Sequence, residues 1–210
     1  MCIFTFMMET LLSFAFATSI LAISPGPDNI FVLTQSIVNG RKFGMATVGG
    51  LIAGCLVHTS LLAFGVSALI KASDSLFMGI KIFGSTYLLY LAHEIYKTDA
   101  SISLSEENTP KKTTKQLFKQ GFIMNVLNPK VSIFFLAFFP GFLFSSTMNT
   151  VSQFYILGFI FMFISFFIFS GIAILAGTIS TSLKNNNKIS LYLKWSQFFV
   201  FILIAIFILL

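Results

Sequence analysis

Six long apolar runs, separated by short polar gaps, constrain the fold of this chain more than any other feature. Each run has close to the roughly 20 residues that an α-helix needs to cross a bilayer. The runs cover about 11–38, 44–70, 76–96, 117–139, 154–179 and 191–210. Only 10% of the residues are charged and 56% are hydrophobic, whereas a water-soluble domain has about a quarter of its residues charged. We therefore predict an all-α membrane protein of six transmembrane helices, with the lipid bilayer as its solvent.

The basic residues gather in alternate gaps between these runs, so the net charge of +6 does not indicate nucleic-acid binding. Loops rich in lysine and arginine face the cytoplasm. We therefore expect the loops near 39–43, 97–119 and 180–194 to be cytoplasmic, and both termini to face outward. The corresponding localisation is the bacterial cytoplasmic (inner) membrane. Glu9 is the only early charge, which does not fit a signal peptide, although Met7 or Met8 as the true start stays a hypothesis.

A polar stretch rich in serine, threonine, glutamate and lysine divides the six runs into two groups of three. This division predicts a first three-helix repeat at 1–97, a cytoplasmic linker at 98–116 and a second repeat at 117–210. Because each half has an odd number of spans, the second half must enter the membrane in the opposite sense. We therefore expect two inverted repeats.

The first and fourth runs are each interrupted by proline at a similar depth. The first interruption reads SPGPDN, residues 24–29, and the second reads NPK, residues 128–130. Asp28 lies ten residues before Val38 and Pro129 ten residues after Lys119, which is roughly 15 Å from the same edge in both cases. This is half of a hydrocarbon core of about 30 Å. We therefore predict that helices 1 and 4 are broken and that the breaks meet near the midplane.

Such paired interruptions in two inverted halves indicate the substrate site of a transporter. Pro25 or Pro27, and Pro129 after an Asn128 cap, suit the start of a half-helix, whose free N–H groups attract anions. A charged side chain at this depth costs about 2.5–3.5 kcal/mol unless it is paired or hydrated. Asp28 and Lys130 are therefore the strongest candidates for function, and they could pair with each other when no ligand is bound.

The same residues carry a family resemblance. The stretch Pro25–Asp28, the Gly40-Arg41 turn followed by Gly44, Gly50 and Gly54, the triplet 128–130 and the run Phe134–Pro140 resemble the LysE/RhtB family of bacterial amino-acid exporters. The resemblance covers nearly the whole chain and is weakest in the linker and the last two spans. One departure is Gly141, where the family often has glutamine. The resemblance implies efflux of amino acids or close derivatives, such as homoserine-, threonine- or leucine-type solutes, by proton antiport, and it does not choose among them.

A zwitterionic substrate suggests how the candidate residues act. Its carboxylate would bind Lys130 and the half-helix N–H groups, and its ammonium would bind Asp28. Further hydrogen bonds would come from Asn29, Asn125 and Asn128, while the backbone at Pro25, Gly26, Pro27 and Pro129 shapes the site. The alternative is that Asp28 only caps a helix and that Lys130 only extends toward the membrane surface.

Asp28 and His58 are the candidates for proton coupling. The unperturbed pKa of histidine, about 6.5, suits a proton carrier. A lone histidine within the membrane can equally serve as a hydrogen-bonding partner for a neighbouring helix. The Gly50–Gly54 spacing is interpreted as a helix-packing motif rather than as a ligand site.

Other functional classes find less support in the sequence. There is no motif that indicates a cofactor, a metal cluster or an enzyme, and Cys55 reads as a small packed residue. A passive pore would need polar faces along several helices, whereas runs 154–179 and 191–210 are almost wholly apolar. An exporter of another small solute or a metal cation, and a non-transport membrane scaffold, remain alternatives. The sequence leaves homo-oligomerisation open.

Overall fold

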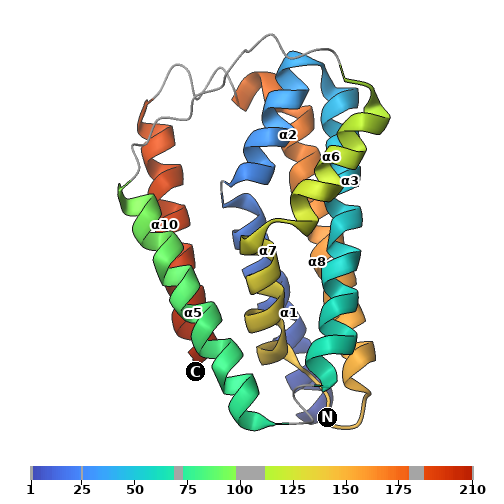
Figure 1. The fold of residues 1–210 in the computed structure, drawn as a ribbon, viewed down its shortest axis with the longest axis vertical. Helices are drawn as coiled ribbons and strands as arrows, with labels where there is room; N and C mark the ends of the chain where they lie inside the picture. Colours follow the sequence, from blue (N-terminus) through green and yellow to red (C-terminus); the bar gives the residue numbers. More distant parts are fainter. Residues whose placement is uncertain (1, 25, 69–72, 98–111, 180–186, 210) are drawn as a thin grey trace.

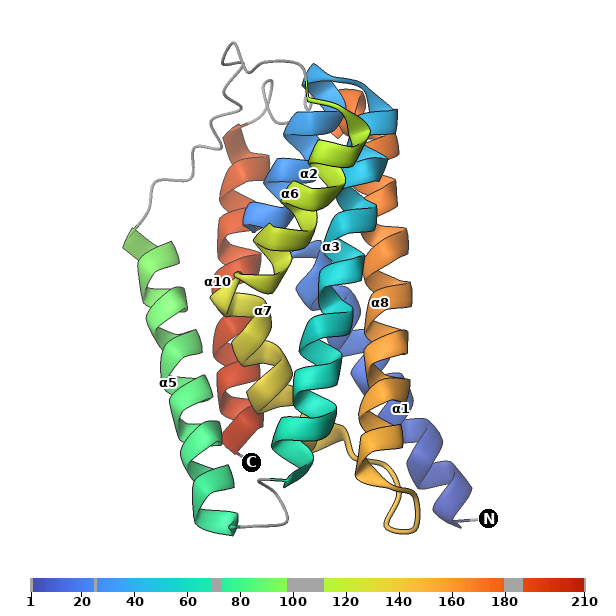
Figure 2. The same cartoon turned by 45° about the vertical axis from the view of Figure 1, so that its right-hand side comes forward.

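The structure is a computed structural model, and it describes residues 2–24, 26–68, 73–97, 112–179 and 187–209. All regular structure within these ranges is helical, as expected. Figures 1 and 2 show an elongated bundle whose helices run roughly along its long axis. Pro25, and residues 98–111 of the predicted linker, lie outside the described residues.

The described residues of the first half include four long α-helical segments, and the third of them continues into a π-helical turn. Their bounds are Cys2–Ile23 (α1), Pro27–Val38 (α2), Arg41–Leu61 (α3), Leu62–Val66 (the π-helical turn η1) and Asp74–Lys97 (α5). The first predicted run differs from the structure at its start, because helix α1 begins at Cys2 rather than near Leu11. Isoleucine, phenylalanine and methionine continue the helix toward the N-terminus there.

The second half begins with a capped helix and contains a second short π-helical turn. Its elements are Thr114–Val126 (α6), Pro129–Ile133 (α7), Phe134–Phe138 (the π-helical turn η2), Phe139–Phe142 (the 3₁₀ turn η3), Thr150–Ile174 (α8) and Asn187–Leu209 (α10). Thr113 and Gln116 form a reciprocal capping box, so α6 begins slightly before the predicted end of the linker.

Within the described residues, five helices are long and apolar enough to cross a membrane, and a sixth span results if one bent pair is counted as a single crossing. The five are Thr5–Ile23, Arg41–Val66, Ser75–Lys97, Thr150–Ile174 and Leu191–Leu209. The bent pair joins Thr114–Val126 to Pro129–Phe142 at 49°. The chain is therefore a multi-pass, all-helical membrane protein.

Both interruptions begin a new helix at a proline. Gly26 is extended, with φ −161° and ψ 177°, and Pro27 occupies the first turn of α2. Asn128 caps α7 by accepting a hydrogen bond from the Lys130 N–H, and Pro129 follows it. Proline suits this position because it has no N–H to leave unpaired. The starts of α2 and α7 therefore follow the local rules expected from the sequence.

Close helix packing occurs between α3 and α6. A methyl group on Gly50 would meet the Phe118 carbonyl, and one on Gly54 would lie 2.8 Å from the Cβ of Asn125. On the facing helix, Gly121 lies against the backbone of Thr47. The glycines thus let the two backbones approach, which confirms the packing interpretation of the Gly50–Gly54 motif.

The bundle has two different ends (Figure 1). The N-terminus and the last residue of α10 lie at the same end, while the α2–α3 connection lies at the opposite end. Within the described residues, the helix ends near Arg41, Lys97 and Thr114 also lie toward that opposite end. The described helix ends that border the first two basic gaps of the sequence therefore lie toward one end of the bundle.

Candidate functional site

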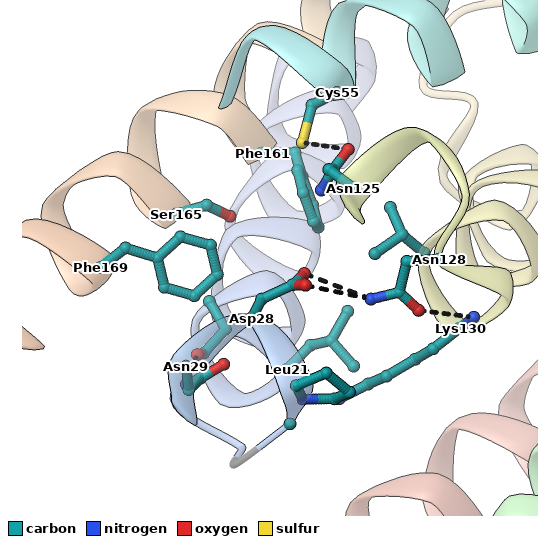
Figure 3. Close-up of a pocket in the computed structure, with 14 residues that line it drawn as sticks. Leu21, Asp28, Asn29, Cys55, Asn125, Asn128, Lys130, Phe161, Ser165 and Phe169 are labelled. Atoms are coloured by element: carbon teal, nitrogen blue, oxygen red, sulfur yellow. Dashed lines mark hydrogen bonds between the residues drawn. The ribbon is translucent and has the colours of Figure 1, made fainter. Parts of the chain in front are cut away.

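The two interruptions lie next to each other and are joined by a direct contact. Figure 1 shows both at a middle height of the bundle. The Asn128 amide donates from its Nδ2 to both carboxylate oxygens of Asp28, at 3.3 Å each (Figure 3). Asp28 is only 7% exposed, so this amide is an important partner for a buried carboxylate. Residues separated by one hundred positions in the sequence therefore meet at one point.

Each interruption removes a helical hydrogen bond, and a polar side chain contacts the affected carbonyl in both places. The extended conformation of Gly26 leaves the Ala22 carbonyl without its usual helical donor, and Asn29 Nδ2 donates to that oxygen at 2.9 Å. Because Pro129 has no N–H, the Asn125 carbonyl loses its donor from four residues later, and it accepts from the Asn128 N–H at 3.0 Å instead. His58 Nε2 lies 3.0 Å from this oxygen. A helix break in lipid must be compensated within the protein, and Asn29 and His58 do this.

The Asn128 side chain is held in a defined orientation by the same contacts. Its Oδ1 accepts a hydrogen bond from the Lys130 N–H at 3.0 Å. Since the carbonyl oxygen faces its own helix, the NH₂ group of the amide faces Asp28, as Figure 3 shows. Asn128 thus has two roles, as a helix cap and as a donor to the carboxylate.

Lys130 reaches from α7 toward α2 and α10 rather than toward the Asp28 carboxylate. Its ammonium lies 4.8 Å from the centroid of the Phe201 ring, a distance at which a cation is attracted by the aromatic face. It is also 3.3 Å from the place that a Cβ on Gly26 would take. The expectation that Asp28 pairs directly with Lys130 is wrong for this structure: no ion pair joins these two described residues, because Asn128 occupies the carboxylate.

A cavity of about 40 Å³ lies at the interruptions. It is large enough for roughly three water molecules. Most of the predicted site residues line it: Gly26, Pro27, Asp28, Asn29, Asn125, Asn128 and Lys130. The structure therefore brings an acid, a base and three asparagines from α2, α6 and α7 into one cavity (Figure 3).

Two of the described predicted residues do not belong to the lining of this cavity. Pro129 is exposed and does not form part of the cavity wall. It affects the site because it has no backbone N–H. His58 is 4% exposed and reaches the site only through the Asn125 carbonyl, while its ring packs 5.4 Å from that of Phe135. Pro25 lies outside the described residues.

Seven further residues line the cavity, and the sequence did not indicate any of them as a site residue. They are Leu21, Ala22, Cys55, Val131, Phe161, Ser165 and Phe169. Phe161, Ser165 and Phe169 follow one another at intervals of four on α8, so they share one face of that helix. Ser165 could be noticed as a polar residue in an apolar run. However, Ser170 carries the same signal in the same run and does not line the cavity.

The cavity carries one anionic and one cationic side chain, and this balance suits a ligand that has both charges. Metal binding has no comparable support, because the described residues contain no group of three or more histidine, cysteine, aspartate or glutamate side chains that could hold a metal ion. The buried thiol of Cys55 contacts Asn125 Oδ1 at 3.7 Å rather than a second thiol or a histidine.

Known proteins that resemble this chain include efflux proteins of the amino-acid type. The leucine efflux protein of Enterobacter sp. (strain 638) is 32% identical over 152 residues, which cover 70% of this chain and 72% of that protein. The homoserine/homoserine lactone efflux protein of Salmonella typhimurium is 28% identical over 172 residues, or 82% of both chains. No solved structure shows a significant match. The family model of the LysE type translocator matches residues 19–210. The chain therefore belongs to the LysE type translocator family.

Proposed function

We propose that this protein is a secondary active exporter of amino acids or close derivatives, coupled to protons by antiport. The family and the efflux relatives support an exporter of the amino-acid type. The observation that carries the proposal is the cavity in which Asp28, Asn128 and Lys130 meet between two interrupted helices. A translocator family also agrees with the expectation that the chain is not an enzyme.

The two charged side chains suit the two charged groups of a zwitterion. The substrate ammonium would replace the Asn128 amide at Asp28, and the substrate carboxylate would draw the Lys130 ammonium away from Phe201. Helix α7 has only five residues, so binding of the carboxylate rests on Lys130 rather than on a helix dipole. Because the substrate is neutral overall, its binding adds no net charge to the site, and only a proton bound or released at Asp28 changes that charge.

Transport by this site requires the helices to move. A cavity of about 40 Å³ holds a few water molecules, whereas an amino acid has at least five non-hydrogen atoms. In the proposed mechanism the cavity widens toward one membrane face and then toward the other. The opposed directions of the two halves suit this rocking motion, and an inverted repeat with both breaks near the midplane is part of the proposal.

Asp28 is the favoured proton carrier, and His58 is the second candidate. A carboxylate can release its proton when the substrate ammonium arrives, which couples the two ions through one group. His58 Nε2 faces a carbonyl, which can only accept, so this nitrogen must hold its proton to keep the contact. A further proton could bind only at Nδ1.

The proposed location is the bacterial inner membrane, with the basic end of the bundle in the cytoplasm. Arg41, Lys42, Lys97 and Lys112 support this orientation, because loops that are rich in these residues face the cytoplasm. On this orientation the termini face outward. A homo-oligomer, another small solute or a metal cation as substrate, and a scaffold role are not favoured by any particular observation.

Counterflow in proteoliposomes tests the proposal. The purified protein is reconstituted, labelled amino acids are supplied one at a time, and flux is measured with and without an imposed pH gradient. We expect gradient-dependent flux of at least one amino acid, and a loss of at least tenfold in Asp28→Asn, because the neutral amide cannot bind an ammonium ion as a carboxylate does.

The control variant is Glu9→Gln, which makes the same chemical change at an exposed acid outside the cavity. We expect this variant to transport like the wild type. If no amino acid is transported by intact wild-type protein, or if Asp28→Asn transports normally, the proposed function is wrong.

A further inference from the structure

Hydroxyl groups within the helices of this protein usually bond to the carbonyl four residues earlier. Such a bond gives the hydroxyl group a hydrogen-bond partner where no water is available. They are made at 2.7–2.9 Å by Thr10, Ser19, Ser36, Thr59 and Thr86. A buried hydroxyl without any partner departs from this pattern, and the described residues contain five of them: Thr18, Ser24, Ser67, Ser165 and Ser170.

Ser165 on α8 departs from it at the cavity. The side chain is 1% exposed, and its Oγ makes no hydrogen bond in the structure. The carbonyl of Phe161, four residues earlier, is the partner that the other serines would use. An unpaired buried hydroxyl costs free energy. Figure 3 shows that the Ser165 hydroxyl instead points into the cavity, on the α8 side.

The polar and apolar parts of the cavity lie on different walls. Asn128 and Lys130 come from the α6–α7 side, and Asp28 lies between them and α8 (Figure 3). The α8 wall consists of Phe161, Ser165 and Phe169. A zwitterion whose charged groups sit at Asp28 and Lys130 therefore directs its side chain toward α8. Ser165 is the polar residue that this wall offers.

We infer that Ser165 is a specificity-determining residue, whose hydroxyl bonds to a hydroxyl group on the side chain of a neutral amino acid. The surrounding phenylalanines favour a short aliphatic side chain, and Ser165 selects the hydroxylated form over an aliphatic side chain of the same size. A site with an unpaired polar group discriminates against the analogue that lacks the matching group. This inference rests on the proposed function of amino-acid export.

Competition between side chains of equal size tests the inference. In proteoliposomes, threonine is compared with valine and homoserine with norvaline, as competitors of counterflow by a transported labelled amino acid. We expect the wild type to prefer the hydroxylated member of each pair. In Ser165→Ala this preference falls by about three- to tenfold, which corresponds to one hydrogen bond. Ser165→Thr, which restores a hydroxyl, retains it.

Ser170→Ala is the matched control. Ser170 is also a buried serine of α8 whose hydroxyl is unpaired, but it does not line the cavity. We expect Ser170→Ala to prefer the hydroxylated competitors as strongly as the wild type does. The inference is overturned if the wild type shows no preference, if Ser165→Ala leaves the preference unchanged, or if it weakens both members of a pair equally. These results leave Asp28-dependent export intact, whereas absence of all amino-acid flux would contradict the proposed function itself.

Discussion

At the scale of single residues, the site is organised by polar side chains that complete interrupted backbone. Asn29 donates to the Ala22 carbonyl, and His58 donates to the Asn125 carbonyl, which also accepts from the Asn128 N–H. Asn128 caps one helix while its side chain contacts the acid of the other. These contacts give the polar residues at the two interruptions, which are costly in a bilayer, partners inside the protein. The contact between His58 and the Asn125 carbonyl gives His58 a structural role, which can be tested separately from a role in proton coupling.

The structural role predicts that His58 stabilises the fold without setting the pH dependence of export. His58→Ala leaves the Asn125 carbonyl without its side-chain donor, and we expect a loss of about 1–2 kcal/mol. His58→Gln, which keeps an N–H donor, should lose less. Thermal unfolding in detergent, followed by the fluorescence of Trp195, measures both.

The pH profile of export by His58→Gln completes the test. We expect it to match the wild type, because Asp28 is the favoured carrier. A flattened profile, in a variant that unfolds at the same temperature as the wild type, would show that His58 carries the proton.

At the scale of elements, the α3–α6 contact holds the second interruption in place. Asn125, near the end of α6, is positioned by Gly54 and His58 of α3. The glycines bring the two backbones so close that no side chain fits between them. Because the same helix pair carries the packing motif and one wall of the cavity, a change in the packing of α3 against α6 also changes the cavity.

Adding one methyl group at this contact should be destabilising. In Gly50→Ala the new Cβ meets the Phe118 carbonyl, and backbone cannot move aside as a flexible side chain can. We expect a loss of about 1–3 kcal/mol, as for other overpacked interiors. The neighbouring Gly49→Ala is the control, since its Cβ would lie 3.4 Å from the Phe118 ring, an ordinary contact. Equal unfolding temperatures of the two variants would contradict the close approach.

At the scale of the whole molecule, the cavity is bounded by a cluster of phenylalanines. Helix α7 continues through η2 and η3 toward the end of the bundle that carries the termini (Figure 1). Phe135 stacks on Phe139 with 4.1 Å between centroids, and Phe161 of α8 packs 5.0 Å from Phe135. All three are at most 6% exposed. On the proposed orientation, these rings close the site toward the outside.

Cys55 offers a test of movement in the whole molecule, since it lines the cavity and is 2% exposed. In a Cys2→Ser background, we expect N-ethylmaleimide to modify Cys55 slowly without substrate and faster during counterflow, as the cavity widens. Mass spectrometry follows the modification. The same experiment with Asp28→Asn is the control and should show no acceleration. Equal rates with and without flux would contradict the proposed widening.

The local structure of the site was largely predictable from sequence. Proline and asparagine act on their immediate neighbours, so the starts of α2 and α7, and the cap at Asn128, follow from short-range rules. The membrane class likewise follows from run length and composition. By contrast, the start of α1 was misjudged, because polar and apolar residues mix near the N-terminus without a helix stop.

Sequence by itself determined that this chain spans a membrane, where its two interruptions fall, and which charged residues they carry. The tertiary structure alone decided how those residues pair. It placed Asn128 rather than Lys130 on Asp28, directed His58 to the Asn125 carbonyl, and turned Ser165 rather than Ser170 into the cavity. The physical reason is distance along the chain: caps and breaks are local, whereas these contacts depend on how whole helices rotate and pack against one another.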